Sequence, residues 1–158
     1  MRKVIVVSLL LLILLAGNQM ATGQDRTLGL GTALGGPDGL SYKYWMSETS
    51  ALAGMVSFAI AENQSRFYTH FDYLTHKFYD ELEWETGRVY YFYGGGLGYE
   101  WQQGHSDDVL TVRLPSGLGF DMVDIPVGGF FELAPTITLS PDLRFAFVGN
   151  FGFRFYLN

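Results

Sequence analysis

Large apolar residues alternate with small or polar ones most regularly at the C-terminal end of the chain. From residue 143 to residue 158 every odd position is Leu, Phe or Gly, while the even positions hold mainly small residues together with Arg144 and Arg154. Successive side chains of a strand point to opposite faces of a sheet. The pattern therefore predicts a strand with one bulky apolar face and one face of small residues and charges.

The side toward which this Phe-rich face points decides the environment of the protein. The interior of a soluble eight-stranded barrel barely holds ordinary side chains, so eight strands of this kind could not place their aromatic rings there. Turned outward into lipid, the same rings are stabilised, and Gly, Ala and a few paired charges suit a narrow polar interior. The pattern therefore favours a transmembrane β-barrel.

Similar alternation recurs along the rest of the chain. Seven further segments are predicted to be strands: 27–35, 40–47, 50–61, 66–76, 88–101, 109–123 and 127–139. With the last segment they predict an all-β fold, an eight-stranded antiparallel up-and-down transmembrane barrel. Residues 78–87, which include the acidic stretch from Asp80 to Glu85, are predicted to form the longest polar connection, on the periplasmic side with both termini.

The N-terminal residues predict export. Arg2 and Lys3 form a positive start, 4–15 form an apolar run, and 21–23 offer a small-residue cleavage site before Gln24. The apolar run is too short for a stable transmembrane helix. We therefore expect residues 1–23 to be a cleaved signal peptide and 24–158 to be a single barrel domain.

Composition narrows the possible partners. Of ten Lys and Arg residues, Arg2 and Lys3 lie in the predicted signal peptide, so eight remain against sixteen Asp and Glu. Such an acidic chain is not expected to bind nucleic acid. The absence of Cys excludes disulfides, thiolate metal sites and lipidation at a cysteine.

Two resemblances support the prediction of a barrel. The last residues resemble the C-terminal recognition signal of bacterial outer-membrane barrels at four positions: Asn150, Gly152, Phe155 and Leu157. The segments 113–118, 131–135 and 152–156 are similar to the C-terminal half of a family of small, uncharacterised outer-membrane barrel proteins, and the general architecture resembles OmpA/OmpX-type barrels. The resemblance implies a fold, a location in the bacterial outer membrane, lipid as surroundings and the barrel-assembly machinery as a partner, and it implies no catalytic residues.

The charged residues predicted to face the interior form the candidate site. They are Lys43, His70, Asp72, Glu100, Arg113, Asp121, Glu132, Arg144 and Arg154. Arg113, Glu132 and Arg154 lie on consecutive predicted strands and are expected to meet, with Arg144 nearer the outer rim. Charges in such an interior are tolerable only when paired, so this network is interpreted mainly as structural.

No other chemistry is predicted. His70 and His76 would lie about 20 Å apart along one strand and cannot share a metal ion. No nucleophile, base and orienting group can be assembled, so neither catalysis nor a cofactor is expected.

Three functions remain open from the sequence. The first is a small, non-enzymatic outer-membrane barrel with a filled polar interior and a structural or surface-interaction role. The second is a narrow pore or a small-ligand transport or binding module, whose ligand the sequence leaves unknown. The third, which the exposed Phe stripe disfavours, is a soluble periplasmic carrier resembling lipocalins.

Overall fold

The computed structural model describes residues 27–61, 64–84, 86–104 and 107–157. These residues form one antiparallel sheet, and no helix occurs among them. Its nine strands are β1 (Leu28–Leu34), β2 (Gly39–Trp45), β3 (Ser50–Ala61), β4 (Gln64–Trp84), β5 (Gly87–Gln102), β6 (Val109–Arg113), β7 (Ser116–Met122), β8 (Val127–Ser140) and β9 (Arg144–Leu157). The prediction of an all-β antiparallel fold is confirmed; the predicted signal peptide, 1–23, lies outside the described residues.

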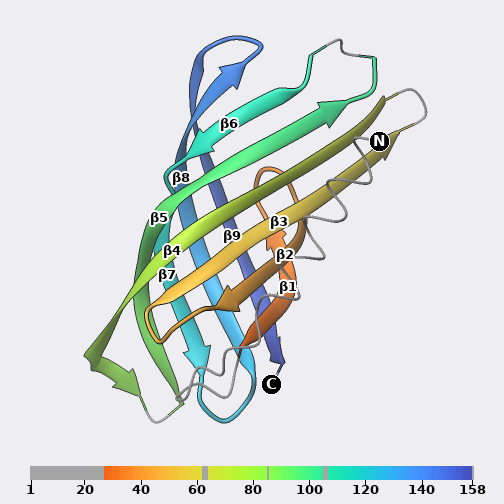
Figure 1. Ribbon diagram of the computed structural model, residues 1–158. Helices are drawn as coiled ribbons and strands as arrows, with labels where there is room; N and C mark the ends of the chain where they lie inside the picture. The colour runs from red at the N-terminus through yellow and green to blue at the C-terminus, as the bar shows by residue number, and fades with distance from the viewer. Residues whose placement is uncertain (1–26, 62–63, 85, 105–106, 158) are drawn as a thin grey trace.

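Consecutive strands are hydrogen-bonded neighbours along most of the sheet. β1 pairs with β2, β2 with β3, β3 with β4 and β4 with β5, and at the other end of the chain β8 pairs with β9. The first strand also pairs with the last, from Leu28 opposite Leu157 to Leu34 opposite Phe151. Figure 1 shows the resulting curvature, with β1 and β9 side by side. Nowhere in the described ranges is there a helix long and apolar enough to cross a membrane.

The prediction of eight strands is wrong because residues 109–123 form two strands instead of one. β6 and β7 are separated at Leu114 and Pro115, yet both lie between β5 and β8. Pro115 has no backbone N–H and cannot donate to a strand ladder. Its carbonyl still accepts from Gly94 N at 2.9 Å, and Leu114 N donates to the Pro135 carbonyl at 2.9 Å. The two short strands therefore occupy the place of one.

The prediction of a long polar connection at 78–87 is also wrong. β4 continues to Trp84 and β5 begins at Gly87, with Glu83 opposite Arg88 after an irregularity that follows Phe78. Polarity alone suggested a loop, but a strand beside a continuing partner can satisfy its backbone whatever its side chains are. β4 and β5 therefore form a long hairpin that is paired as far as Trp84 opposite Gly87.

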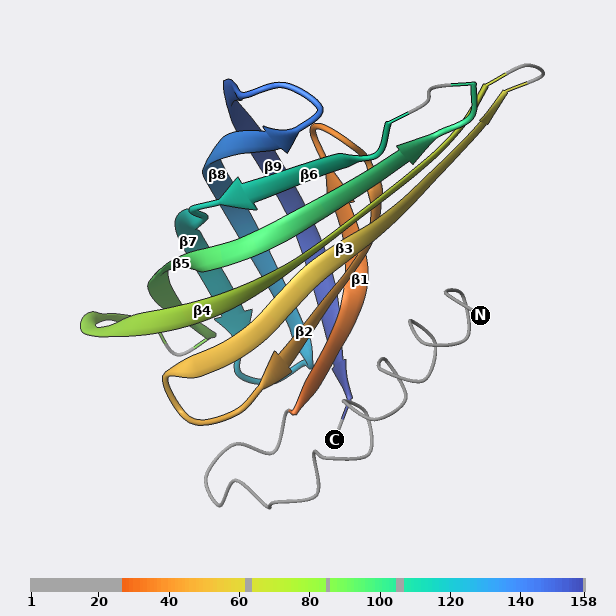
Figure 2. The same ribbon diagram turned by 45° about the horizontal axis from the view of Figure 1, so that its top comes forward.

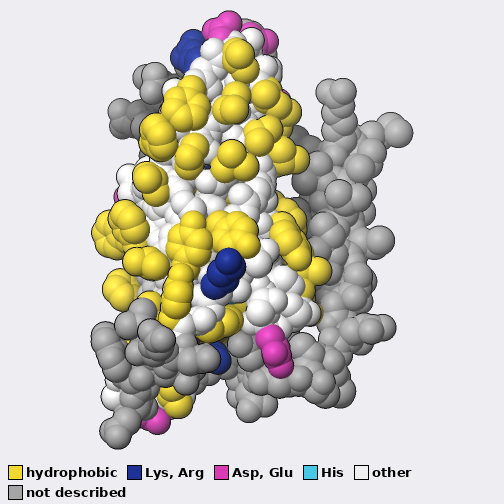
Figure 3. Space-filling view, turned by 90° about the vertical axis from the view of Figure 1, so that its left-hand side faces the viewer, with side chains coloured by type: hydrophobic (Ala, Val, Ile, Leu, Met, Phe, Trp, Pro, Cys, Tyr) yellow, Lys and Arg dark blue, Asp and Glu magenta, His cyan; other side chains and the backbone are white. Residues whose placement is uncertain are grey.

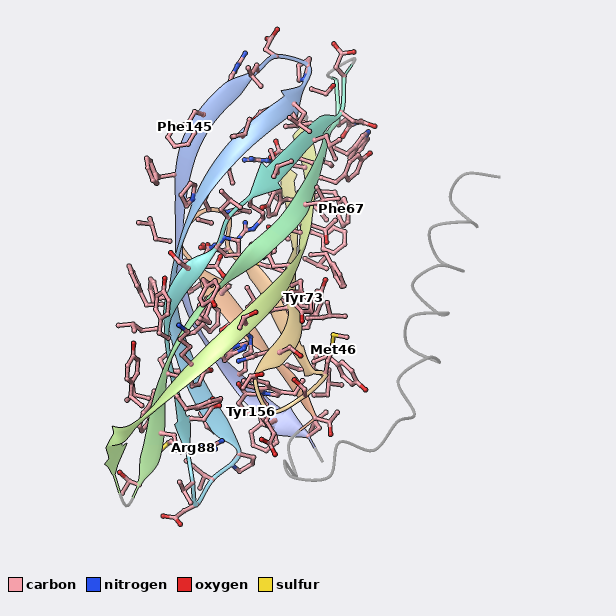
Figure 4. All side chains as sticks on the ribbon, turned by 60° about the vertical axis from the view of Figure 1, so that its left-hand side comes forward. Met46, Phe67, Tyr73, Arg88, Phe145 and Tyr156 are labelled. Carbon is pink, nitrogen blue, oxygen red and sulfur yellow. The ribbon has the colours of Figure 1, made fainter. Side chains whose placement is uncertain are left out.

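The two faces of the sheet differ sharply in burial. Along β9 from Asn150 to Tyr156 the even positions are buried and the odd positions exposed, which is the predicted alternation. Figure 3 shows apolar side chains spread widely over one side of the outer surface, with few charged groups among them. Figure 4 shows Phe145 and Tyr73 on the outside of the curved sheet, and their exposed fractions are 63% and 49%. We call the buried side the inner face.

The sheet has two ends, which we name by what lies there. The termini end carries the start of β1, the end of β9 and the turns after Trp45, Trp84 and Met122. The far end carries the β1–β2, β3–β4, β5–β6 and β8–β9 connections. In Figure 1 the β1–β2 turn lies well below the tip of the β8–β9 hairpin.

Candidate functional site

The candidate site is a layer of charged side chains on the inner face, in the middle of the sheet. Asp72 comes from β4, Arg113 from β6 and Glu132 from β8, and each is at most 5% exposed. Strand alternation places all three inward, and a glycine provides room for one of them. A Cβ on Gly96, which lies opposite Asp72, would stand 1.9 Å from the Asp72 carboxylate.

Arg113 connects the three strands of this charged layer. Its Nε donates to Asp72 Oδ2 at 3.1 Å and its Nη1 to the Tyr68 hydroxyl at 3.1 Å, while its Nη2 donates to Glu132 Oε1. The planar guanidinium matches carboxylate geometry and offers five donors. One cation therefore serves two buried carboxylates that would otherwise repel each other.

His70 completes the charged layer. Its Nδ1 lies 3.2 Å from the Tyr68 hydroxyl, and its Nε2 lies 3.5 Å from Asp72 Oδ2. Possible metal-ligand atoms of His70, Asp72 and Glu132 lie within 4.8 Å of one another. The Arg113 guanidinium contacts both carboxylates of this set, so a metal ion would have to compete with a cation that is already in place. The arrangement is that of an internal ion-pair cluster.

A second cluster lies on the inner face toward the termini end, and most of it is aromatic. Lys43, 1% exposed, donates from Nζ to the Tyr90 hydroxyl at 3.2 Å and lies 3.8 Å from the Trp45 ring centre. The Tyr90 hydroxyl in turn donates to Asp121 Oδ1 at 3.4 Å. The Trp45 ring centre lies 4.3 Å from that of His76, and both rings also pack against Tyr90. Lys43 is thus held by ring faces and one hydroxyl.

Arg154 does not join Arg113 and Glu132, which corrects the expectation that the three would meet. Its Nε donates to Ser41 Oγ at 2.9 Å, and its guanidinium carbon lies 3.9 Å from the Phe130 ring centre. The reason lies in the register, since Asn150 faces Glu132 while Arg154 faces Gly128. Arg154 is therefore closer to the termini end than the charged layer.

Two predicted members of the network lie apart from it, toward the far end. Glu100, whose side chain is 17% exposed, pairs with Arg66 Nη2 at 2.5 Å. Arg144, 73% exposed, contacts Asp142 at 3.1 Å. The predicted rim position fits Arg144, but its side chain is not part of a buried network.

The four residues of the C-terminal recognition pattern divide between the two faces. Asn150 and Gly152 are buried on the inner face, whereas Phe155 and Leu157 are 52% and 43% exposed on the outer face. Asn150 Oδ1 accepts a hydrogen bond from Gly36 N at 3.3 Å, which ties β9 to the β1–β2 turn.

Sequence reasoning missed several residues that complete the two clusters. These residues include Tyr68, Trp45 and Tyr90. Their odd or even position along each strand places them on the inner face, and this position was the only indication of their role in the sequence. Parity does not reveal which side chain on another strand each would contact, because that depends on the register.

Comparisons with known proteins give no assignment. No protein-family model, curated protein or solved structure matches this chain. What the protein does is therefore inferred from its own residues and geometry.

Proposed function

We propose that this chain is a small integral β-barrel protein of the bacterial outer membrane, with a structural or surface-interaction role and no enzymatic activity. The observation that carries the proposal is the inverted polarity of the sheet. Lys43, Asp72 and Arg113 are at most 1% exposed, whereas Phe145, Phe147 and Phe153 are each 63% exposed. Lipid-facing apolar side chains around a polar interior are typical of transmembrane barrels.

The pairing of β1 with β9 supports a closed barrel. Seven residue pairs join these strands, and every other strand has a neighbour on each side. The hydrocarbon core of a membrane contains no water to hydrogen-bond the backbone N–H and C=O groups of an open sheet edge. A sheet that spans a membrane must therefore close on itself. The proposed route begins with export by residues 1–23 and ends with assembly through the C-terminal strand.

The contents of the inner face favour a structural role over transport. Arg113 joins three strands across the middle of the inner face. Tyr90 and Phe92, at most 2% exposed, fill the interior between Arg113 and the termini end. A continuous water path would have to pass both clusters. We therefore propose a filled interior.

The first experiment is gel mobility of the protein from purified outer membranes, with and without boiling. A closed transmembrane barrel resists detergent until it is heated, so the unboiled protein should migrate differently. Recovery in the soluble periplasmic fraction without a heat-dependent shift would contradict the proposal and favour a soluble carrier of apolar ligands.

A narrow pore is the second candidate, because polar and charged side chains line the inner face. Planar-bilayer recordings should show no steady conductance from the wild-type protein if the interior is filled. Steady, size-limited conductance that changes in Glu132→Ala, which removes one partner of Arg113, would establish the pore instead.

A further inference from the structure

Lys77 is an exception on the otherwise uncharged outer face. Strand alternation along β4 places it on that face with Tyr73 and Tyr79, and its side chain is exposed. No other outward-facing strand position with a described side chain is charged. None of the ion pairs between described side chains includes Lys77. A cation on an apolar surface must be solvated or paired, so its partner has to come from outside the described part of the chain.

Tyrosines surround Lys77 on the outer face. Tyr91 of β5 lies directly opposite it, and the Tyr93 ring centre lies 5.9 Å from its Nζ. These two rings are stacked, with their centres 5.8 Å apart. On β4 itself, Tyr73 and Tyr79 are 49% and 48% exposed. Tyrosine combines an apolar ring with a polar hydroxyl, and lysine an apolar stem with a charged end, so this group suits the boundary between hydrocarbon and headgroups.

The fold places Lys77 at the termini end of the outer surface. Thr75, two residues earlier, pairs with Ser50, the first residue of β3. β4 then continues past the β2–β3 turn, as Figure 2 shows, and residues 47–49 of that turn are polar and exposed. The acidic stretch from Asp80 to Glu85 follows along the same hairpin. The order along β4 is therefore an uncharged outer surface, then a cation, then an acidic segment, which matches hydrocarbon, phosphate and water.

The length of β4 above Lys77 matches the thickness of a bilayer. Toward the far end, the next exposed charged side chain of β4 is Arg66, eleven residues before Lys77. With a rise of about 3.3 Å per residue and a strand tilt of about 40°, these two levels lie about 28 Å apart across the membrane. The apolar band of transmembrane barrels is about 25 Å tall. Trp101, 42% exposed beside Arg66 on the neighbouring strand, supplies an interfacial aromatic residue at the upper level.

We propose that Lys77 binds the headgroup phosphate of a glycerophospholipid in the periplasmic leaflet, and that this contact sets the depth of the barrel in the membrane. An ammonium group donates charge-assisted hydrogen bonds to phosphate oxygens at about 2.7–2.9 Å, and the hydroxyls of Tyr91 and Tyr93 are further donors on the same face. The acyl chains would then run along the apolar surface toward the far end. This inference rests on the proposed function, since it requires the sheet to lie in a membrane.

The test uses ¹⁵N at the lysine Nζ, because only Lys43 and Lys77 remain once Lys3 is removed with the predicted signal peptide. Labelled protein is purified from outer membranes and reconstituted in phosphatidylethanolamine–phosphatidylglycerol vesicles without free phosphate. Solid-state NMR then measures the dephasing of each ¹⁵N signal by nearby ³¹P. Lys43, 1% exposed in the interior, is the control within the same sample, and Lys77→Arg assigns the spectrum by removing one signal while keeping the charge. A second sample contains phosphorus-free galactolipid vesicles with added inorganic phosphate.

The inference expects a several-fold loss of the Lys77 signal in the phospholipid sample, with no loss for Lys43 and none for either lysine in the galactolipid sample. An unaffected Lys77 signal, from protein that keeps its heat-dependent gel shift, would mean that Lys77 lies away from the phosphates and would overturn the inference alone. Equal dephasing of Lys77 by inorganic phosphate would mean that any phosphate is bound, and would also overturn it. Protein that shows no gel shift and does not remain with the vesicles would overturn the proposed function itself.

Discussion

The two halves of the inner face use the same strand alternation but are filled differently. Toward the termini end, Trp45, Tyr90 and Phe92 are at most 4% exposed and their rings pack against one another and against His76. Toward the far end, the inward positions of β3 and β9 hold Ala59 and Ala146, which stay exposed. Alternation thus determines which side chains point inward, and aromatic rings from several strands fill the interior toward the termini end.

The charged layer lies between these two halves and joins β4, β6 and β8. Arg113, fully buried, contacts residues of β4 and β8 from its own position on β6. A buried charge that loses its partner is strongly destabilising, whereas an exposed pair contributes little. The largest change in stability is therefore expected from substitutions in the charged layer, which lies at the boundary between the two halves.

The largest effect is expected for Arg113→Met. It leaves Asp72 and Glu132 buried without their cation, and should lower the free energy of unfolding by about 3–5 kcal/mol. Urea unfolding in lipid vesicles measures this change. In the matched control Arg144→Met, the exposed arginine at the far end should change stability by less than about 0.5 kcal/mol.

A compensated variant separates lost charge pairing from lost packing. Asp72→Asn and Glu132→Gln added to Arg113→Met should recover most of the stability, because no unpaired charge then remains. If Arg113→Met alone unfolded like wild type, Arg113 could not be the residue that neutralises the two carboxylates.

The outer face should respond to a charge according to depth. Phe153, which pairs with Gly129 and Thr32, lies well inside the sheet, so Phe153→Arg should cost about 2–4 kcal/mol of membrane-folded stability if it is near the midplane. Phe145 is close to the β8–β9 turn at the far end, and Phe145→Arg should cost only about 0–1 kcal/mol if that end lies at the interface. Refolding yield and urea unfolding in vesicles measure both variants. Equal tolerance of both arginines would count against a lipid-facing outer surface.

Two alanines test whether the inner face is tightly packed in the middle of the sheet and open toward the far end. Ala134 on β8 is 0% exposed, whereas Ala146 on β9 is exposed. Ala134→Leu should therefore overpack its surroundings and cost about 1–3 kcal/mol. Ala146→Leu should change the free energy of unfolding by less than about 0.5 kcal/mol, since its side chain enters open space. The same destabilisation in both variants would show that the far half is packed as tightly as the centre.

Much of the fold was predictable because alternation acts locally. The strand pattern from 143 to 158 gave the correct faces for Phe153 and Arg154, and the segments 27–35 and 40–47 were already shorter than the others. The division at Pro115 was not predicted, although a proline within a strand was visible. The missing donor of a proline can be accommodated in several ways, and the surrounding pairing decides among them.

The composition of the candidate site was less predictable than the faces. Parity placed Arg154 inward correctly, but its contacts with Ser41 and Phe130 depend on the offset between distant strands. The one-sided pairing of β3 beyond Val56 and of β9 before Phe151 likewise follows from unequal hairpin lengths, and it becomes apparent only once β1 and β9 are paired. Register is a property of the assembled sheet, so contacts across it could not be derived from single segments.

A smaller effect than that of Ala134→Leu is expected at Asn150, which belongs both to the predicted assembly signal and to an observed hydrogen bond. Asn150 Oδ1 accepts from Gly36 N and holds the β1–β2 turn against β9. Asn150→Ala should therefore lower stability by about 0.5–1.5 kcal/mol in refolded protein, where no assembly machinery is present. Val148→Ala, on the same face two residues earlier, is the control for lost side-chain volume. If Asn150→Ala unfolds like wild type in vesicles but reaches the outer membrane poorly in cells, recognition during assembly outweighs the hydrogen bond, and the turn is held by its other contacts, in which Gly35 N donates to Asp38 Oδ1 and Ser57 Oγ donates to the Asp38 carbonyl.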